Sequence, residues 1–147
     1  ALLSIGILAF TAFTSFGQTE AIQIENPNAP QISFETEVID YGTIDKGADG
    51  VREFKFTNTG KSPLIISNAR GSCGCTVPTW PKEPIKPGET SAIKVKYDTN
   101  RPGPINKSVT ITSNAKTPTK VLRIKGNITV PQTSPEKKVP AAAPVAN

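Results

Sequence analysis

Apolar and polar residues alternate in short runs between residues 31 and 130. Phe54 and Phe56 lie two positions apart, as do Val109 and Ile111, with polar residues between them. A period of two places one set of side chains on a buried face, and β-branched and aromatic residues favour strands. No window has the spacing of an amphipathic helix. The pattern predicts strands over residues 32–34, 37–41, 51–59, 63–69, 73–77, 90–97, 107–113 and 120–130.

Turn-forming residues separate these runs. Pro87-Gly88 supplies the two central residues of a tight turn, and Pro102-Gly103 repeats the device. Several short strands divided by such turns are typical of a β-sandwich. We therefore expect an all-β protein with a single immunoglobulin-like Greek-key sandwich of seven or eight strands, spanning residues 31–130.

Both ends of the chain differ from this body. Residues 1–17 are uncharged and largely apolar, but too short for a comfortable membrane span. They are typical of the apolar part of a secretory signal whose start is trimmed, with cleavage before Gln18. Residues 18–30 form a lead-in with proline breakers, and residues 131–147 form a Pro/Ala-rich tail that we expect to be disordered. The mature chain is expected to carry no membrane span.

The amino-acid composition excludes several kinds of catalytic and metal-binding site. The chain has no His and no Met, and only two Cys. Without histidine there is no Ser-His-Asp or Cys-His catalytic machinery and no imidazole metal ligand. Lys plus Arg number 17 against 12 Asp plus Glu, a net charge of +5. The basic residues alternate with apolar ones on the late strands, which indicates a solvated sheet face rather than a nucleic-acid site.

Six segments carry a resemblance to a known family. They are Asp-Tyr-Gly-Thr-Ile at 40–44, Phe-Lys-Phe-Thr-Asn-Thr-Gly at 54–60, Pro-Leu-Ile-Ile at 63–66, Ser-Cys-Gly-Cys-Thr at 72–76, Pro-Ile-Lys-Pro-Gly-Glu at 84–89 and Ser-Asn at 113–114. In these the chain resembles the bacterial DUF1573 proteins, which are immunoglobulin-like domains related to major-sperm-protein and pilus-chaperone sandwiches. The resemblance implies an exported binding domain without a defined catalytic activity, and the start of the chain resembles exported Bacteroidetes proteins.

Cys73 and Cys75 are the concentrated chemical signal, and four states are open to them. A disulfide fits an oxidising compartment, and its three-residue ring would stabilise the fold by roughly 1.6 kcal/mol on the chain-entropy model. A redox-active pair would use an exchangeable bridge. A soft-metal site would need a second chain to complete its ligands. Two free, buried thiols are the fourth state. The structural bridge is the interpretation we favour.

The predicted function follows from these features. We expect a non-enzymatic cell-envelope module that binds a protein partner, such as an accessory subunit of a periplasmic or outer-membrane complex, with no cofactor and no nucleic acid. The alternatives are a periplasmic thiol-redox or copper-binding protein using the cysteines, and more weakly a glycan-binding module. Trp80 is expected to act mainly as a packing anchor. The candidate contact loop comprises Ser72, Cys73, Gly74, Cys75, Thr76 and Trp80.

Overall fold

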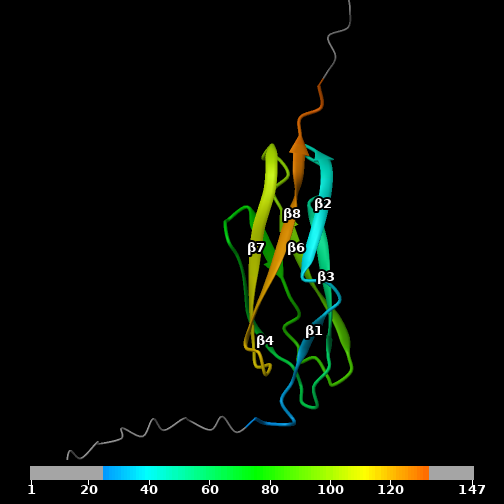
Figure 1. Cartoon of the computed structure of the whole chain (residues 1–147), viewed down its shortest axis with the longest axis vertical. Helices are drawn as coiled ribbons and strands as arrows, with labels where there is room; N and C mark the ends of the chain where they lie inside the picture. Colours follow the sequence, from blue (N-terminus) through cyan, green and yellow to red (C-terminus); the bar gives the residue numbers. More distant parts are fainter. Residues whose placement is uncertain (1–24, 133–147) are drawn as a thin grey trace, which may run out of the picture.

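The computed structural model describes residues 25–132, which fold into two packed four-stranded sheets (Figure 1). The predicted signal segment, the first part of the lead-in and nearly all of the predicted tail lie outside these residues. No described segment is a helix that could cross a membrane. The strands are β1 (Ile32–Phe34), β2 (Val38–Asp45), β3 (Val51–Asn58), β4 (Ile66–Gly71), β5 (Thr76–Thr79), β6 (Thr90–Tyr97), β7 (Gly103–Ser113) and β8 (Thr119–Thr129).

One sheet has the order β1-β3-β6-β5 and the other β2-β8-β7-β4. All neighbours are antiparallel except β2 and β8, which run parallel. The chain changes sheet at several connections, and two of them, β1–β2 and β4–β5, join edge strands, so each flank of the sandwich has a connection from one sheet to the other. The immunoglobulin-like sandwich predicted from the sequence is confirmed.

The core forms where the inward-facing sets of the two sheets meet. Phe54, Phe56 and Ile93 come from one sheet, and Leu122 and Ile111 from the other, and all five are almost completely buried. Their spacing is the period-two pattern of the sequence, which is why the alternation located the strands. At roughly 25 cal/mol per Å² of buried apolar surface, this shared layer is the main stabilising contribution to the fold.

Four predicted strands need correction. β2 continues to Asp45 rather than ending at residue 41, and β7 begins at Gly103 rather than at residue 107. Residues 73–75 form a turn, and β5 starts only at Thr76. The strand predicted over residues 63–69 starts too early. Leu64 forms only an isolated bridge with Ile85, and β4 begins at Ile66. In these last two places apolar residues anchor a connection to the core, and this gives a strand-like alternation without a strand.

Candidate functional site

The turn between β4 and β5, residues 72–75, contains both cysteines. Cys73 and Cys75 lie at disulfide-bonding distance, with Cα atoms 5.2 Å apart. The amide of Thr76 donates to the carbonyl of Cys73 at 3.2 Å, which closes a tight turn. This bent backbone brings the two side chains together, in place of the extended strand expected from the sequence.

Hydrogen bonds hold the β4–β5 turn to both sheets. The amide of Ser72 donates to the carbonyl of Ser108 in β7 at 2.8 Å, and the amide of Ser108 donates to the Ser72 hydroxyl at 3.1 Å. On the other side, the amide of Asp98, just after β6, donates to the carbonyl of Cys75 at 2.9 Å. The turn is therefore fixed relative to both layers of the sandwich.

Fewer residues of this turn are exposed than the contact loop predicted from the sequence contains. Cys75 and Thr76 are buried, Cys73 is half-buried, and each cysteine sulfur lies 3.7 Å from the Thr76 hydroxyl. Ser72 and Gly74 are the exposed positions. A partner protein could touch these two residues and part of Cys73, whereas Cys75 and Thr76 act as supports from below.

A shallow depression of about 430 Å³ adjoins the turn, between the edges of β4 and β5. Val77 lies on its rim and is 54% exposed. Val77 lies outside the contact loop predicted from the sequence. The sequence did contain a signal for the exposure of Val77. Val77 follows Thr76, and neighbouring residues of a strand face opposite sides, so one of the two faces solvent when the other is buried.

Trp80 lies at the other end of β5, about 13 Å along the strand from the turn. Its indole N–H donates to the carbonyl of Ile66 at 3.1 Å, and its ring packs against the core. The Lys82 ammonium stands 3.1 Å from the ring centroid. Trp80 therefore joins the edges of β4 and β5 at a point distant from the cysteines, and the structure does not bring it into the same surface.

The cysteine pair has no ring of further metal ligands around it. Within residues 25–132, no group of three or more Cys, Asp or Glu side chains is placed to hold a metal ion. Elsewhere in the described part of the chain, burial raises the pKa of the Tyr41 phenol in β2, and Arg52 opposes that effect. The Tyr41 hydroxyl donates to the carbonyl of Gly50 at 2.8 Å, so this tyrosine secures a strand end.

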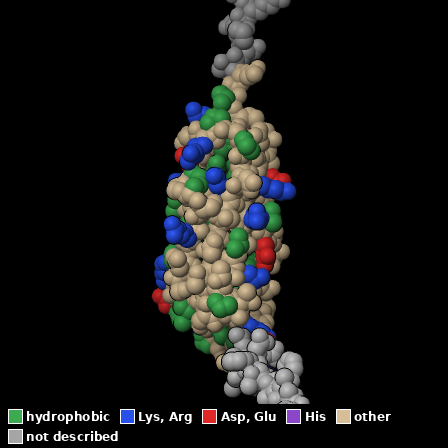
Figure 2. All heavy atoms as spheres, turned by 60° about the vertical axis from the view of Figure 1, so that its left-hand side comes forward, with side chains coloured by type: hydrophobic (Ala, Val, Ile, Leu, Met, Phe, Trp, Pro, Cys, Tyr) green, Lys and Arg blue, Asp and Glu red, His purple; other side chains and the backbone are tan. Residues whose placement is uncertain are grey.

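The flank that carries the β4–β5 turn is shown in Figure 2. Apolar side chains are scattered among Lys and Arg, and Asp and Glu stand mostly near the margins of the view. A broad apolar patch would mark an obligate interface. A partner on this flank would therefore meet a mixed surface with single apolar positions such as Val77.

Residues 32–128 match the family described as "Protein of unknown function (DUF1573)". The chain belongs to the DUF1573 family. The match covers all of the sandwich and includes the β4–β5 turn, which confirms the family resemblance seen in the sequence. No curated protein matches the chain.

Solved structures show the same fold as this DUF1573 domain. A Porphyromonas gingivalis W83 protein of unknown function superposes with a TM-score of 0.62 at 15% identity, over 73% of this chain and 51% of its own. The ASH/PapD-like domain 7 of human CEP192 gives 0.56 at 8% identity, over 88% and 99%. The Vibrio cholerae protease VesB gives 0.53 at 16%, over 66% and 32%. The chain thus spans about half of the Porphyromonas protein, and these identities show the fold alone.

Proposed function

We propose that this DUF1573 domain is a non-enzymatic protein-binding module of the cell envelope, serving as an accessory subunit of a periplasmic or outer-membrane complex. The contact surface would be the β4–β5 turn with Val77. The observation that carries the proposal is the attachment of this turn to both sheets, by the bonds from Ser72 to Ser108 and from Asp98 to Cys75.

Rigid attachment matters because ordering a loop on binding costs free energy. About 0.5–1.5 kcal/mol is lost for each flexible side chain that a complex immobilises. A turn already fixed by the cysteine bridge and by two strands avoids much of that loss. The family match and the fold, which is shared with PapD-like domains, agree with a binding role.

The turn is too small to form the whole interface. A stable complex usually covers about 800 Å² on each partner. The outer face of the neighbouring sheet can supply the rest, because Val77 stands beside Lys96 of β6, which in turn stands beside Val51 of β3. This row offers two exposed apolar side chains around one ammonium group, a composition suited to a partner with apolar and acidic side chains.

The envelope location rests on the sequence. The apolar segment at 1–17 is typical of an export signal, and a bridged cysteine pair suits an oxidising compartment. Fractionation of cells that produce the full chain would check this part by itself. Recovery in the cytoplasm would contradict the location without affecting the binding role.

Site-specific photo-crosslinking tests the proposed surface. A crosslinking side chain is placed at Val77, and a matched one at Val130, an exposed valine just after β8 at one end of the sandwich. We expect a discrete crosslinked species in envelope membranes from position 77 and none from position 130. The substitution Val77→Glu should reduce the yield of this complex by about tenfold, as for a residue near the centre of an interface, and Val130→Glu should not. Equal yields at both positions would refute the proposed surface.

The thiol-redox alternative is separated by a second variant. Replacing Cys73 and Cys75 with serine removes the thiol chemistry but retains Ser72, Gly74 and Val77. If the turn acts as a contact surface, the double variant should keep a weakened complex. Loss of cellular function together with full retention of the complex would favour redox or copper chemistry.

A further inference from the structure

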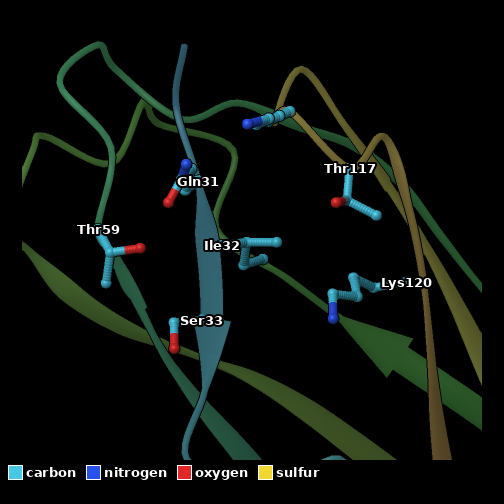
Figure 3. Close-up of a pocket in the computed structure, with 7 residues that line it drawn as sticks. Gln31, Ile32, Ser33, Thr59, Thr117 and Lys120 are labelled. Carbon is cyan, nitrogen blue, oxygen red and sulfur yellow. The ribbon is translucent and has the colours of Figure 1, made fainter. Parts of the chain in front are cut away.

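The flank opposite the β4–β5 turn contains a second candidate surface, a lateral cleft where the chain crosses between sheets. At one end the amide of Lys116 donates to the carbonyl of Pro30, and at the other the amide of Arg123 donates to the carbonyl of Glu37, both at 2.8 Å. Between these two points β1 pairs with β3 in the other sheet. The lateral cleft measures about 340 Å³ and is lined by Gln31, Ile32, Ser33, Thr59, Lys116, Thr117 and Lys120 (Figure 3).

The backbone of β1 presents free hydrogen-bonding groups at this cleft. The amide of Glu35 donates to Lys55, and the carbonyl of Gln31 accepts from Thr59, so the odd-numbered residues of β1 bond to β3. In an antiparallel pair, the N–H and C=O groups of successive residues point alternately toward the partner strand and away from it. The N–H and C=O groups of Ile32 and Phe34 therefore point away from β3. Because β1 is an edge strand, no strand of the described chain covers these groups.

Other edges of the sandwich are less open to an added strand. On β2, the Thr36 hydroxyl bonds both the amide and the carbonyl of Val38, and the Asp40 carboxylate accepts from the amide of Gly42. On β5, Pro78 has no N–H to donate. Proteins commonly prevent strand addition by occupying or removing the backbone hydrogen-bonding groups of an edge strand. At Ile32 of β1 these groups are neither occupied by a described residue nor missing.

Two ammonium groups flank the lateral cleft, and each already holds a carboxylate. Lys116 binds Glu25 at 2.7 Å and Lys120 binds Glu37 at 2.8 Å. The Glu25 side chain is 71% exposed, so water and salt screen its pair with Lys116, and the pair contributes little to stability. An incoming carboxylate could replace Glu25 at little cost. In Figure 3, β1 runs between Thr59 on one side and Thr117 and Lys120 on the other.

We propose that the lateral cleft binds an extended acidic segment of a partner protein, which adds to the free edge of β1. Its backbone would bond the N–H and C=O of Ile32, and its carboxylates would bind Lys116 and Lys120 in place of Glu25 and Glu37. Glu25 and Glu37 of the chain already bind these two lysines, which indicates that the cleft accepts carboxylates. The net charge of +5 also favours an acidic partner. The inference rests on the proposed binding role but assigns it a second, separate surface.

The test uses the full chain and a capped synthetic hexapeptide of sequence Thr-Glu-Val-Glu-Val-Thr, with the lysine analogue as control. Amide NMR titration should show saturable shifts at Ile32 and Phe34 with the acidic peptide and none with the lysine peptide. Replacing Lys116 and Lys120 with serine should weaken binding by about tenfold, since two exposed ion pairs are lost. Glu25→Gln removes one internal competitor and should tighten binding by up to about fivefold.

Backbone methylation separates strand addition from simple charge attraction. An added edge strand bonds β1 along only one of its two sides. Of two peptides N-methylated on alternate residues, one should lose binding and the other should keep it. Equal effects of the two methylation patterns would overturn the proposal, as would equal binding of acidic and lysine peptides or a chain that dimerises through β1 and excludes the peptide.

The two surfaces can fail independently. Val77→Glu lies on the opposite flank and should leave peptide binding unchanged. If the crosslinked complex is lost in Val77→Glu but the peptide still binds, the lateral cleft stands as a separate site. If the complex persists and the peptide never binds, the proposed function survives and this inference does not.

Discussion

Asn58, at the end of β3, offers the sharpest test of how the loops at one end of the sandwich are held. Its side chain is fully buried and makes four hydrogen bonds. The oxygen accepts from the amides of Gln31 at 3.3 Å and Gly60 at 3.0 Å, and the nitrogen donates to the carbonyls of Ser62 at 2.8 Å and Ile85 at 2.9 Å. One amide group thus ties together the start of β1 and two loops.

The substitution Asn58→Ala removes four hydrogen bonds and leaves three partner groups unpaired, because the Ile85 carbonyl still accepts from the amide of Leu64. At about 0.5–1.5 kcal/mol each, four bonds total roughly 2–6 kcal/mol. We expect a loss of about 3–4 kcal/mol in the free energy of unfolding, because water can reach some of the part-buried partners. A loss of that size would lower the Tm by roughly 12–30 °C in a domain of about a hundred residues.

Urea unfolding followed by the fluorescence of Trp80 measures this loss, since it is the only tryptophan. Asn127→Ala, an exposed asparagine on β8, is the control and should change stability by no more than about 0.5 kcal/mol. Asn58→Asp should be at least as damaging at neutral pH, because a carboxylate cannot donate to two carbonyls, and should recover partly near pH 4 as protonation restores one donor. A loss below about 1 kcal/mol in Asn58→Ala would refute the reasoning.

Three further predictions concern the turn and the buried tyrosine. Gly71→Ala should cost about 2 kcal/mol or more in unfolding free energy, since a Cβ there would overlap the first carbonyl of β5, whereas Gly74→Ala has open space and should be nearly neutral. Thiol titration without reductant should find no free thiol, and serine at both Cys73 and Cys75 should lower stability by about 1.6 kcal/mol or less; two titratable thiols would contradict the bridge. The pKa of Tyr41 is raised by burial, so stability should be intact below pH 10 and fall above it, and Tyr41→Phe should flatten that fall relative to the wild type.

Local alternation made most of the sandwich predictable. Phe54 and Phe56 have the same parity in the sequence and the same buried face in the structure, so period two was sufficient to place β3. The same rule failed at Cys73 and Cys75. Two small apolar residues two positions apart look alike in a strand and in a bridged turn, and only the contacts of that turn with both sheets distinguish them.

Contacts between segments that are far apart in the chain could not be predicted from the sequence pattern. The partners of Asn58 come from positions up to 27 residues away, and the pair of Lys120 with Glu37 spans 83 residues. The sequence indicated that residues 58–60 end a strand, but not that one side chain ties three segments together. The lateral cleft was missed for the same reason, because it forms where the chain passes from β1 in one sheet to β2 in the other.

The parallel pairing of β2 with β8 determines how this domain should respond to tension. The described chain enters at one end of the sandwich and leaves from the end of β8 at the other (Figure 1). A pull along that direction slides β2 past β8, so the hydrogen bonds between them are loaded in shear and must break together rather than one by one. The domain should therefore resist stretching far better than unzipping.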